Sequence, residues 1–178
     1  MIKEGNGRLM VNIAKNLEEI VEIYKNDFSD LDDHITSLRI DKDQWTLKEI
    51  IGHLIDSASN NHQRFIRFQL SEELEFPDYK NSEWLRIQNH QSMKFIDLLS
   101  LFYYYNKLII NIILNIDERY LNNRWNIDWD EKSSFITFEE LLIHYVNHMK
   151  AHLSHFRERL SELEKVLRTW SAERLEDE

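Results

Sequence analysis

Hydrophobic residues recur at spacings of three and four along four long segments, the spacing that places them on one face of an α-helix. The first segment runs from about residue 9 to residue 35, and the second from Thr46 to about residue 70. The third covers residues 91–116, and the fourth runs from Thr137 to at least Leu163. Four long amphipathic helices in one chain predict an all-α fold, a four-helix bundle.

Two of these helices begin with the same signal. In "TLKE" (46–49) and "TFEE" (137–140), a Thr precedes a Glu by three residues, the pattern of a capping box. The loops before the third and fourth helices are long, and the second of them has room for a short hairpin. Because long loops in compact domains often bind ligands, we expect their aromatic residues to shape a pocket: Tyr79, Trp84, Trp125 and Trp129.

The pattern contains no internal repeat and no linker, so residues 1–165 are predicted to form one domain. Beyond it, residues 166–178 end in the acidic sequence "SAERLEDE". Negative charge at a helix C-terminus opposes the helix dipole. The prediction is therefore a helical tail that frays.

The third helix contains an apolar run, "LLSLFYYYNKLIINIILNI" (98–116), that is long enough to imitate a membrane span. Four polar residues interrupt it: Ser100, Lys107, Asn111 and Asn115. At about 100° per residue they fall within about 80° of one another and form one narrow stripe. This pattern predicts a mostly buried bundle helix with one edge in water, because a central Lys would be costly in lipid.

Composition narrows the function. A formal net charge of −10 argues against a general nucleic-acid binder, which needs a basic surface. The chain has no Cys, so it has neither disulfides nor thiolate ligands, and any metal must be held by His or carboxylate. The first residues, "MIKEGNGRLM", have no apolar signal core, so a cytoplasmic protein is expected.

Histidine is concentrated in the fourth helix, where "HYVNHMKAHLSHF" (144–156) holds four of the eight histidines. On a helical wheel His148 and His152 border the apolar face, whereas His144 and His155 lean toward water. Residues at i and i+4 project from one side of a helix, so His148 and His152 can converge on one ion. Such pairs also arise by chance, and two ligands are too few for a stable metal site.

A third ligand would have to come from another helix, and His53 on the second helix is the candidate. It lies off the apolar face, on a polar flank with Ser57, Asn60 and Arg64. That flank is either a solvated stripe or the lining of a wet pocket between helices, and periodicity leaves both readings open.

The remaining histidines are expected to be structural or exposed. His62 falls within the apolar arc of the second helix, so we expect it to pack there with a hydrogen bond. His34 and His90 lie near helix ends and are predicted to be surface residues.

Three stretches in this order, "QWTLKEIIGHLIDSASNNHQRFIRF", "FPDYKNSEW" and "HYVNHMKAHLSHF", resemble the DinB-like (damage-inducible) metal-binding four-helix-bundle superfamily. The likeness extends from about Trp45 to Phe156. It implies one divalent metal ion held by His53, His148 and His152. Related proteins often carry a further histidine where this chain has Ala151.

The same resemblance implies a metal-dependent enzyme. Three neutral imidazoles leave a bound ion its charge and an open position for a water or a thiol. Hydrolysis, or transfer of a low-molecular-weight thiol such as bacillithiol or mycothiol, would follow. Zn²⁺ or Ni²⁺ suits nitrogen ligands best, while Mn²⁺ and Fe²⁺ remain open. His155 and Asp56 are the candidates for supporting the ligands.

Other functions compete with this one. A di-iron centre is excluded because the required Glu-x-x-His pairs are absent. A non-catalytic bundle, stabilised by metal or binding a small ligand, fits the lack of any acid, base or nucleophile beyond the histidines. The expected partners are a small-molecule substrate and a second copy of the chain, through the third helix or residues 117–136, with no nucleic acid and no membrane.

Overall fold

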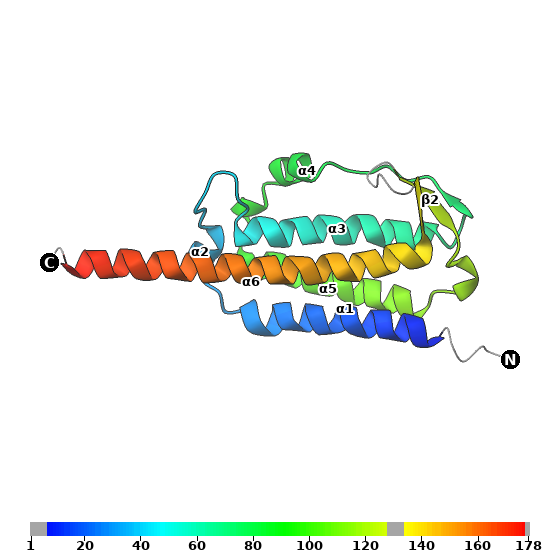
Figure 1. Ribbon diagram of the computed structural model, residues 1–178, viewed down its shortest axis with the longest axis horizontal. Coiled ribbons are helices and arrows are strands. Elements are labelled where there is room, and N and C mark those ends of the chain that lie inside the picture. Colours follow the sequence, from blue (N-terminus) through cyan, green and yellow to red (C-terminus); the bar gives the residue numbers. More distant parts are fainter. Residues whose placement is uncertain (1–6, 128–133, 177–178) are drawn as a thin grey trace.

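A computed structural model describes residues 7–127 and 134–176, with side chains described as far as residue 172. Four long helices form a bundle (Figure 1), which confirms the predicted fold. They are α1 (Gly7–Phe28), α3 (Leu47–Arg67), α5 (Phe95–Leu114) and α6 (Phe138–Glu176). Shorter elements connect them: α2 (Asp33–Ser37), α4 (Asn81–Gln88), and the 3₁₀ turns η1 (His90–Ser92) and η2 (Glu118–Tyr120).

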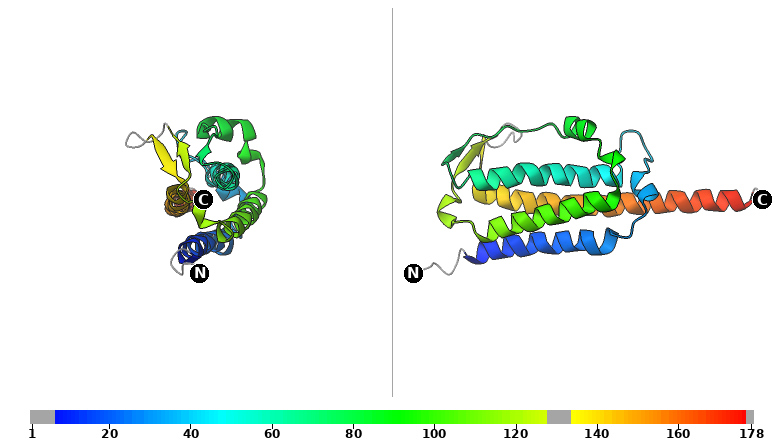
Figure 2. Two further views of the ribbon diagram at one scale, coloured as in Figure 1. Left: turned by 90° about the vertical axis from the view of Figure 1, so that its right-hand side faces the viewer. Right: turned by 180° about the vertical axis from the view of Figure 1, so that it is seen from behind.

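The order of the helices around the bundle determines where the long loops lie. α1 packs against α5 and α6, and α3 packs against the same two helices. Figures 1 and 2 show that α3 and α5 run in the same direction, so the chain between them must return along the bundle. This crossover, residues 68–94, carries α4 along the outer side of α3. The return path therefore provides a cover for one face of α3.

The helix starts follow the sequence signals. The Thr46 hydroxyl accepts from the Glu49 backbone, and the Glu49 carboxylate accepts from the Thr46 backbone. Thr137 and Glu140 make the same reciprocal pair at the start of α6. The single helix predicted for residues 9–35 is wrong, because α1 ends at Phe28 and α2 begins at Asp33. Asp32 caps this new start by accepting from the backbone N–H of His34 at 2.7 Å.

A small sheet closes one end of the bundle. β2 (Arg124–Asn126) pairs antiparallel with β3 (Phe135–Thr137), which confirms the hairpin suggested by the loop before α6. β1 (Glu73–Leu74) adds in parallel to β2, a pairing that the sequence analysis did not predict. Through this pairing the two long loops hold each other beside α3, and Trp125 of β2 is buried.

The polar stripe of α5 faces outward, as predicted. Ser100, Asn111 and Asn115 are exposed, and Lys107 is half-exposed with its Nζ 2.6 Å from Glu18 Oε1. Within the described residues, no helix has the length and apolar character that crossing a membrane requires. α6 extends beyond the ends of the other helices (Figure 1), and the fraying of its last residues stays a prediction.

Two expectations about histidines are corrected. His90 is only 4% exposed, because it packs on Gly52, where an added Cβ would lie 2.3 Å from its Nδ1. The missing side chain of a glycine makes room for the ring. His62 is half-buried as expected, but its Nδ1 has no hydrogen-bond partner among the described residues. Its ring instead meets the ring of Tyr105 edge-on. His34 is exposed, as predicted.

Candidate metal centre

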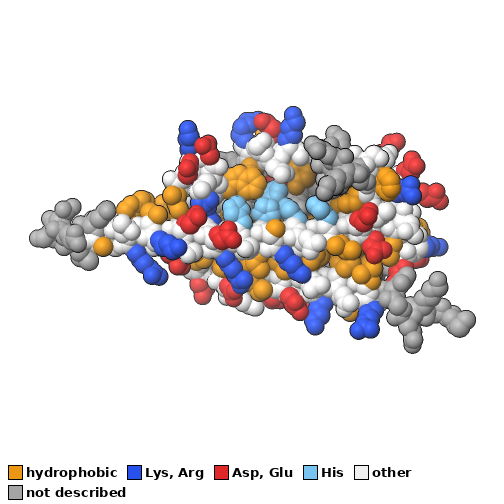
Figure 3. Space-filling view, in the orientation of Figure 1, with side chains coloured by type: hydrophobic (Ala, Val, Ile, Leu, Met, Phe, Trp, Pro, Cys, Tyr) orange, Lys and Arg blue, Asp and Glu red, His pale blue; other side chains and the backbone are white. Residues whose placement is uncertain are grey.

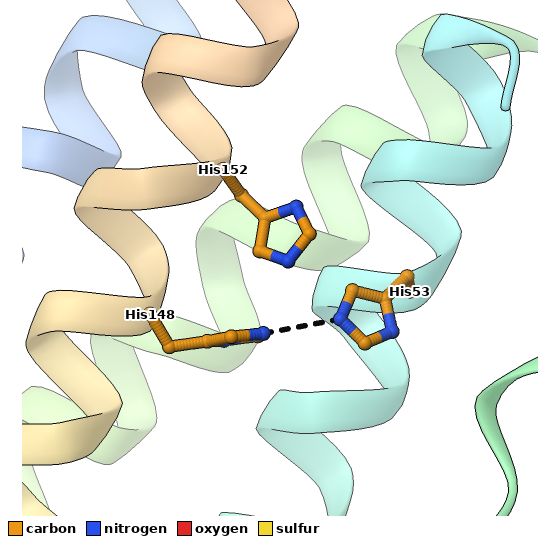
Figure 4. Close-up of side chains that lie close together, drawn as sticks. All are labelled: His53, His148 and His152. Atoms are coloured by element: carbon orange, nitrogen blue, oxygen red, sulfur yellow. Dashed lines mark hydrogen bonds between the residues drawn. The ribbon is translucent and has the colours of Figure 1, made fainter. Parts of the chain in front are cut away.

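Three histidine rings meet between α3 and α6 (Figure 4). His148 and His152 extend from successive turns of α6, and His53 reaches them from α3. Nε2 of His53 lies 3.1 Å from Nε2 of His148, and one ring nitrogen from each of the three residues lies within 4.8 Å of the others. Nitrogens bound at about 2.0–2.1 Å to a tetrahedral ion lie roughly 3.3 Å apart, so the cluster has suitable dimensions for one ion.

His53 is buried although it lies on the polar flank of α3. Its exposed fraction is 4%, and Ser57, Asn60 and Arg64 of the same flank are equally buried. The crossover and the small sheet cover this face. Of the two readings that periodicity left open, the structure supports the lining of a pocket, to which His53, Ser57 and Arg64 contribute.

Burial also sets the charge of the rings. It lowers the pKa of His53 to about 4, that of His148 to about 3 and that of His152 to about 4. Neighbouring histidines add to these shifts, inside the cluster for His53 and His148 and from His155 for His152, since two protonated rings would repel each other. All three rings are therefore neutral at pH 7, the form in which an imidazole nitrogen can bind a metal.

Two side chains fix how the rings are turned. The Trp45 ring stacks on His152, with an angle of 9° between planes and 6.4 Å between centroids, and also contacts His53. Ser57 Oγ lies 3.5 Å from Nδ1 of His148, at the limit of a hydrogen bond. A partner at Nδ1 holds the tautomer that leaves Nε2 free for a metal. The Trp45 of the family resemblance thus acts as a wall of the cluster.

Of the two residues proposed to support the ligands, His155 lies beside the cluster and Asp56 contacts α4 instead. His155 is half-buried, with its ring centroid 6.1 Å from that of His152. Asp56 is 2% exposed, and burial raises its pKa to about 6. It accepts from Gln88 of α4 at 2.5 Å, and among the described residues it makes no hydrogen bond to the three histidines. The ring of His144 is nearly parallel to that of His148, at 6.4 Å.

A pocket of about 280 Å³ opens beside the cluster. Histidine side chains gather on the face of the molecule between α4 and α6 (Figure 3). His53 and His148 form one end of the lining, and Tyr79 and Trp125 contribute as the sequence predicts. Trp84 contacts Tyr79, at 4.8 Å between ring centroids, and does not line the pocket; Trp129 lies outside the described residues.

The sequence analysis missed several residues of the lining, among them Asn61 and Asp78. Asn61 follows Ser57 by four residues on α3, so continuing the polar flank by one turn would have found it. Asp78 lies in the crossover, where no periodic pattern indicates which way a side chain faces. It is held by Arg64, whose Nη2 donates to Asp78 Oδ1 at 3.1 Å.

The fold and the cluster define a class of protein: a four-helix bundle with three histidines that converge between two of its helices. YfiT from Bacillus subtilis, described as a probable metal-dependent hydrolase with an unusual four-helix bundle topology, superposes with a TM-score of 0.75. The match covers 92% of this chain and 90% of YfiT at 19% sequence identity. It shows that this chain shares the four-helix bundle fold of YfiT, and a four-helix bundle is the fold that the resemblance implies.

Sequence comparisons give a consistent picture. Proteins of Bacillus mycoides (strain KBAB4) and Bacillus cereus (strain B4264), both named as putative metal-dependent hydrolases, are each 21% identical to this chain over 160 residues. Each match covers 81% of this chain and 89% of the relative. No family model matches the sequence.

Proposed function

We propose that this protein is a metal-dependent hydrolase that binds one divalent cation through His53, His148 and His152. The observation that carries the proposal is the convergence of three neutral imidazoles at the wall of a pocket. A divalent cation held there would supply Lewis-acid chemistry, lowering the pKa of a water or polarising a carbonyl oxygen. The names of the relatives support the same activity.

The chain's own contribution is to prepare the site. Burial keeps the three rings unprotonated, so a cation does not have to displace protons at neutral pH. Trp45 and Ser57 hold the rings in position, which lowers the entropy lost when they bind an ion. A set of nitrogen ligands favours Zn²⁺ or Ni²⁺ over Mn²⁺ or Fe²⁺.

The first experiment measures the metal. Protein purified without an affinity tag is subjected to elemental analysis, as wild type and as His148→Ala, His152→Ala and His34→Ala. We expect about one divalent ion per chain in the wild type and in His34→Ala, whose histidine is exposed and remote from the cluster. Both cluster variants should lose it. Equal metal content in all four proteins would exclude the site.

The second experiment separates hydrolysis from its alternatives. The metal-loaded protein is assayed with ester, amide and thiol-transfer substrates. Hydrolysis that disappears in His152→Ala supports the proposal. Activity only in thiol transfer would assign the same site to a transferase, and no turnover with a full complement of metal would support a non-catalytic bundle.

A further inference from the structure

Arg64 places a buried positive charge in the same pocket as the histidine cluster. The residue is 5% exposed, and its guanidinium lies over the Trp125 ring, 4.1 Å from the centroid. Burying a guanidinium is costly unless its donors and charge are satisfied. The buried charge of Arg64 therefore requires compensating groups in or around the pocket.

Asp78 compensates it only in part. Its carboxylate takes one hydrogen bond, from Nη2, while 45% of the Asp78 side chain remains exposed. The buried Nε of Arg64 has no partner among the described residues, although a guanidinium carries five N–H donors. A pair that served only to clamp the crossover would be expected to use the two-pronged geometry that Arg and carboxylate readily form. Nη1 also makes no hydrogen bond to the described residues and, unlike Nε, is not fully buried, so it is the donor that another acceptor can reach.

Nearby groups extend this recognition surface. Along α3, His53, Ser57 and Arg64 line the pocket from the cluster toward the small sheet. Asn61 also lines it, and its buried Oδ1 has no partner within the described part of the chain. The pocket thus has Arg64 toward the small sheet and the proposed metal ligands at its other end.

We propose that Arg64 binds the carboxylate of a small substrate whose reacting group lies at His53, His148 and His152. Describing the bound molecule as a substrate rests on the proposed function. The planar donors of Arg match the oxygens of a carboxylate or of a phosphate ester, so the charge of the anion, and not its geometry, favours a carboxylate. A single negative charge suits a guanidinium whose charge Asp78 already offsets in part.

The proposal is tested in metal-free protein labelled with ¹⁵N. The Trp125 ring lies against the Arg64 guanidinium, and its indole N–H donates to Phe76 O. The NMR signal of this indole N–H therefore reports on ligand binding in the pocket. The protein is titrated with butyrate, with butyramide as its uncharged counterpart, and with propyl phosphate. We expect saturable shifts with butyrate, at least tenfold weaker binding of propyl phosphate, and none with butyramide. Equal responses to butyrate and butyramide would overturn the proposal, and tighter binding of propyl phosphate would replace the carboxylate with a phosphate.

Three variants make the test specific. Arg64→Gln should weaken butyrate binding at least tenfold, while Arg67→Gln, an exposed arginine of the same helix, should change it less than twofold. Asp78→Asn removes the competing carboxylate and should strengthen binding several-fold. If Arg64→Gln does not fold, Asp78→Asn still tests the proposal. If the Arg64–Asp78 pair only holds the crossover in place, Asp78→Asn should leave butyrate binding unchanged or weaken it.

Failure of this inference can be distinguished from failure of the proposed function. Protein that holds its metal but gives no Arg64-dependent butyrate response would refute the inference alone. Protein that binds butyrate through Arg64 but takes up no metal would refute the metal site and leave the anion site standing.

Discussion

Two helices of this bundle each carry a polar stripe, with opposite consequences. On α5, Ser100, Lys107 and Asn111 lie on the outer edge, partly or fully exposed to water. On α3, His53, Ser57 and Arg64 are at most 5% exposed. In sequence each stripe runs along one side of an amphipathic helix, and this pattern alone does not tell which stripe is buried. What separates them is the chain outside the helix: the crossover and the small sheet cover α3, whereas the stripe of α5 stays at the surface of the molecule.

The comparison shows where a polar stripe is informative. An exposed stripe costs little, because water satisfies it. A buried one costs free energy at each polar group that lacks a partner. The α3 stripe keeps such groups, among them His53 Nδ1 and Arg64 Nε within the described residues. Buried polar atoms without hydrogen-bond partners are expected where a protein binds a ligand, because such a site keeps polar groups that the protein itself does not satisfy.

Acidification should give the largest effect. In metal-free protein the three cluster histidines have folded-state pKa values of about 3 to 4, below the ordinary 6.5. Below pH 6.5 the unfolded chain takes up protons that the folded chain does not, so this stabilisation is present above pH 6.5 and is lost as the pH falls toward 4. Each of the three histidines alone would account for a loss of roughly 3 kcal/mol between pH 7 and pH 4, so denaturant unfolding over this range should show a loss larger than one histidine can explain.

Controls for this prediction follow from the comparison. Replacing His53, His148 and His152 together by Gln should flatten the pH dependence, while Asn111→Ala on the α5 stripe should leave it unchanged. Asp56 acts in the opposite direction, because its raised pKa of about 6 favours the folded state as the pH falls toward the ordinary 3.8. An equally steep curve in the triple variant would contradict the assignment.

A buried polar group on α5 tests whether burial, and not the helix, decides the cost. Asn106 is fully buried, and its Oδ1 accepts from the Tyr145 hydroxyl at 2.8 Å. Asn106→Ala should lower the free energy of unfolding by about 2–3 kcal/mol, because it leaves that hydroxyl unpaired and opens a cavity. Asn111→Ala, on the exposed edge, should change it by less than about 0.5 kcal/mol. Similar losses of unfolding free energy in the two variants would show that burial does not determine the cost.

A matched pair of serines gives the smallest effect. Ser57 lies beside His148 on the buried stripe, whereas Ser100 is exposed and donates to Ile96 O. Ser57→Ala should weaken Zn²⁺ binding about tenfold, the low end for removing a group that orients a ligand. Ser100→Ala should leave the affinity unchanged. Competition with a chromogenic chelator measures both, and equal affinities in the two variants would remove Ser57 from the site.

Periodicity predicted the bundle, and the capping boxes at Thr46 and Thr137 located two helix starts. On α6 it correctly separated the core residues from the histidine edge, because α6 is straight and its neighbours lie on one side. It could not predict whether His53 is buried, because that depends on the crossover, whose sequence has no helical or strand periodicity. His90 was misplaced for a related reason: its ring fills the space above Gly52, a contact between segments distant in sequence.

The start of α6 has a consequence for how such a chain can change during evolution. Thr137 ends β3 and caps α6, so the sheet and the helix share a fixed reference point. An insertion or deletion of one residue between Thr137 and His148 would turn both histidines by about 100° around the helix axis, away from His53. Length variation among descendants of this chain should therefore accumulate in the connection between β2 and β3, while the interval from Thr137 to His152 keeps its exact number of residues.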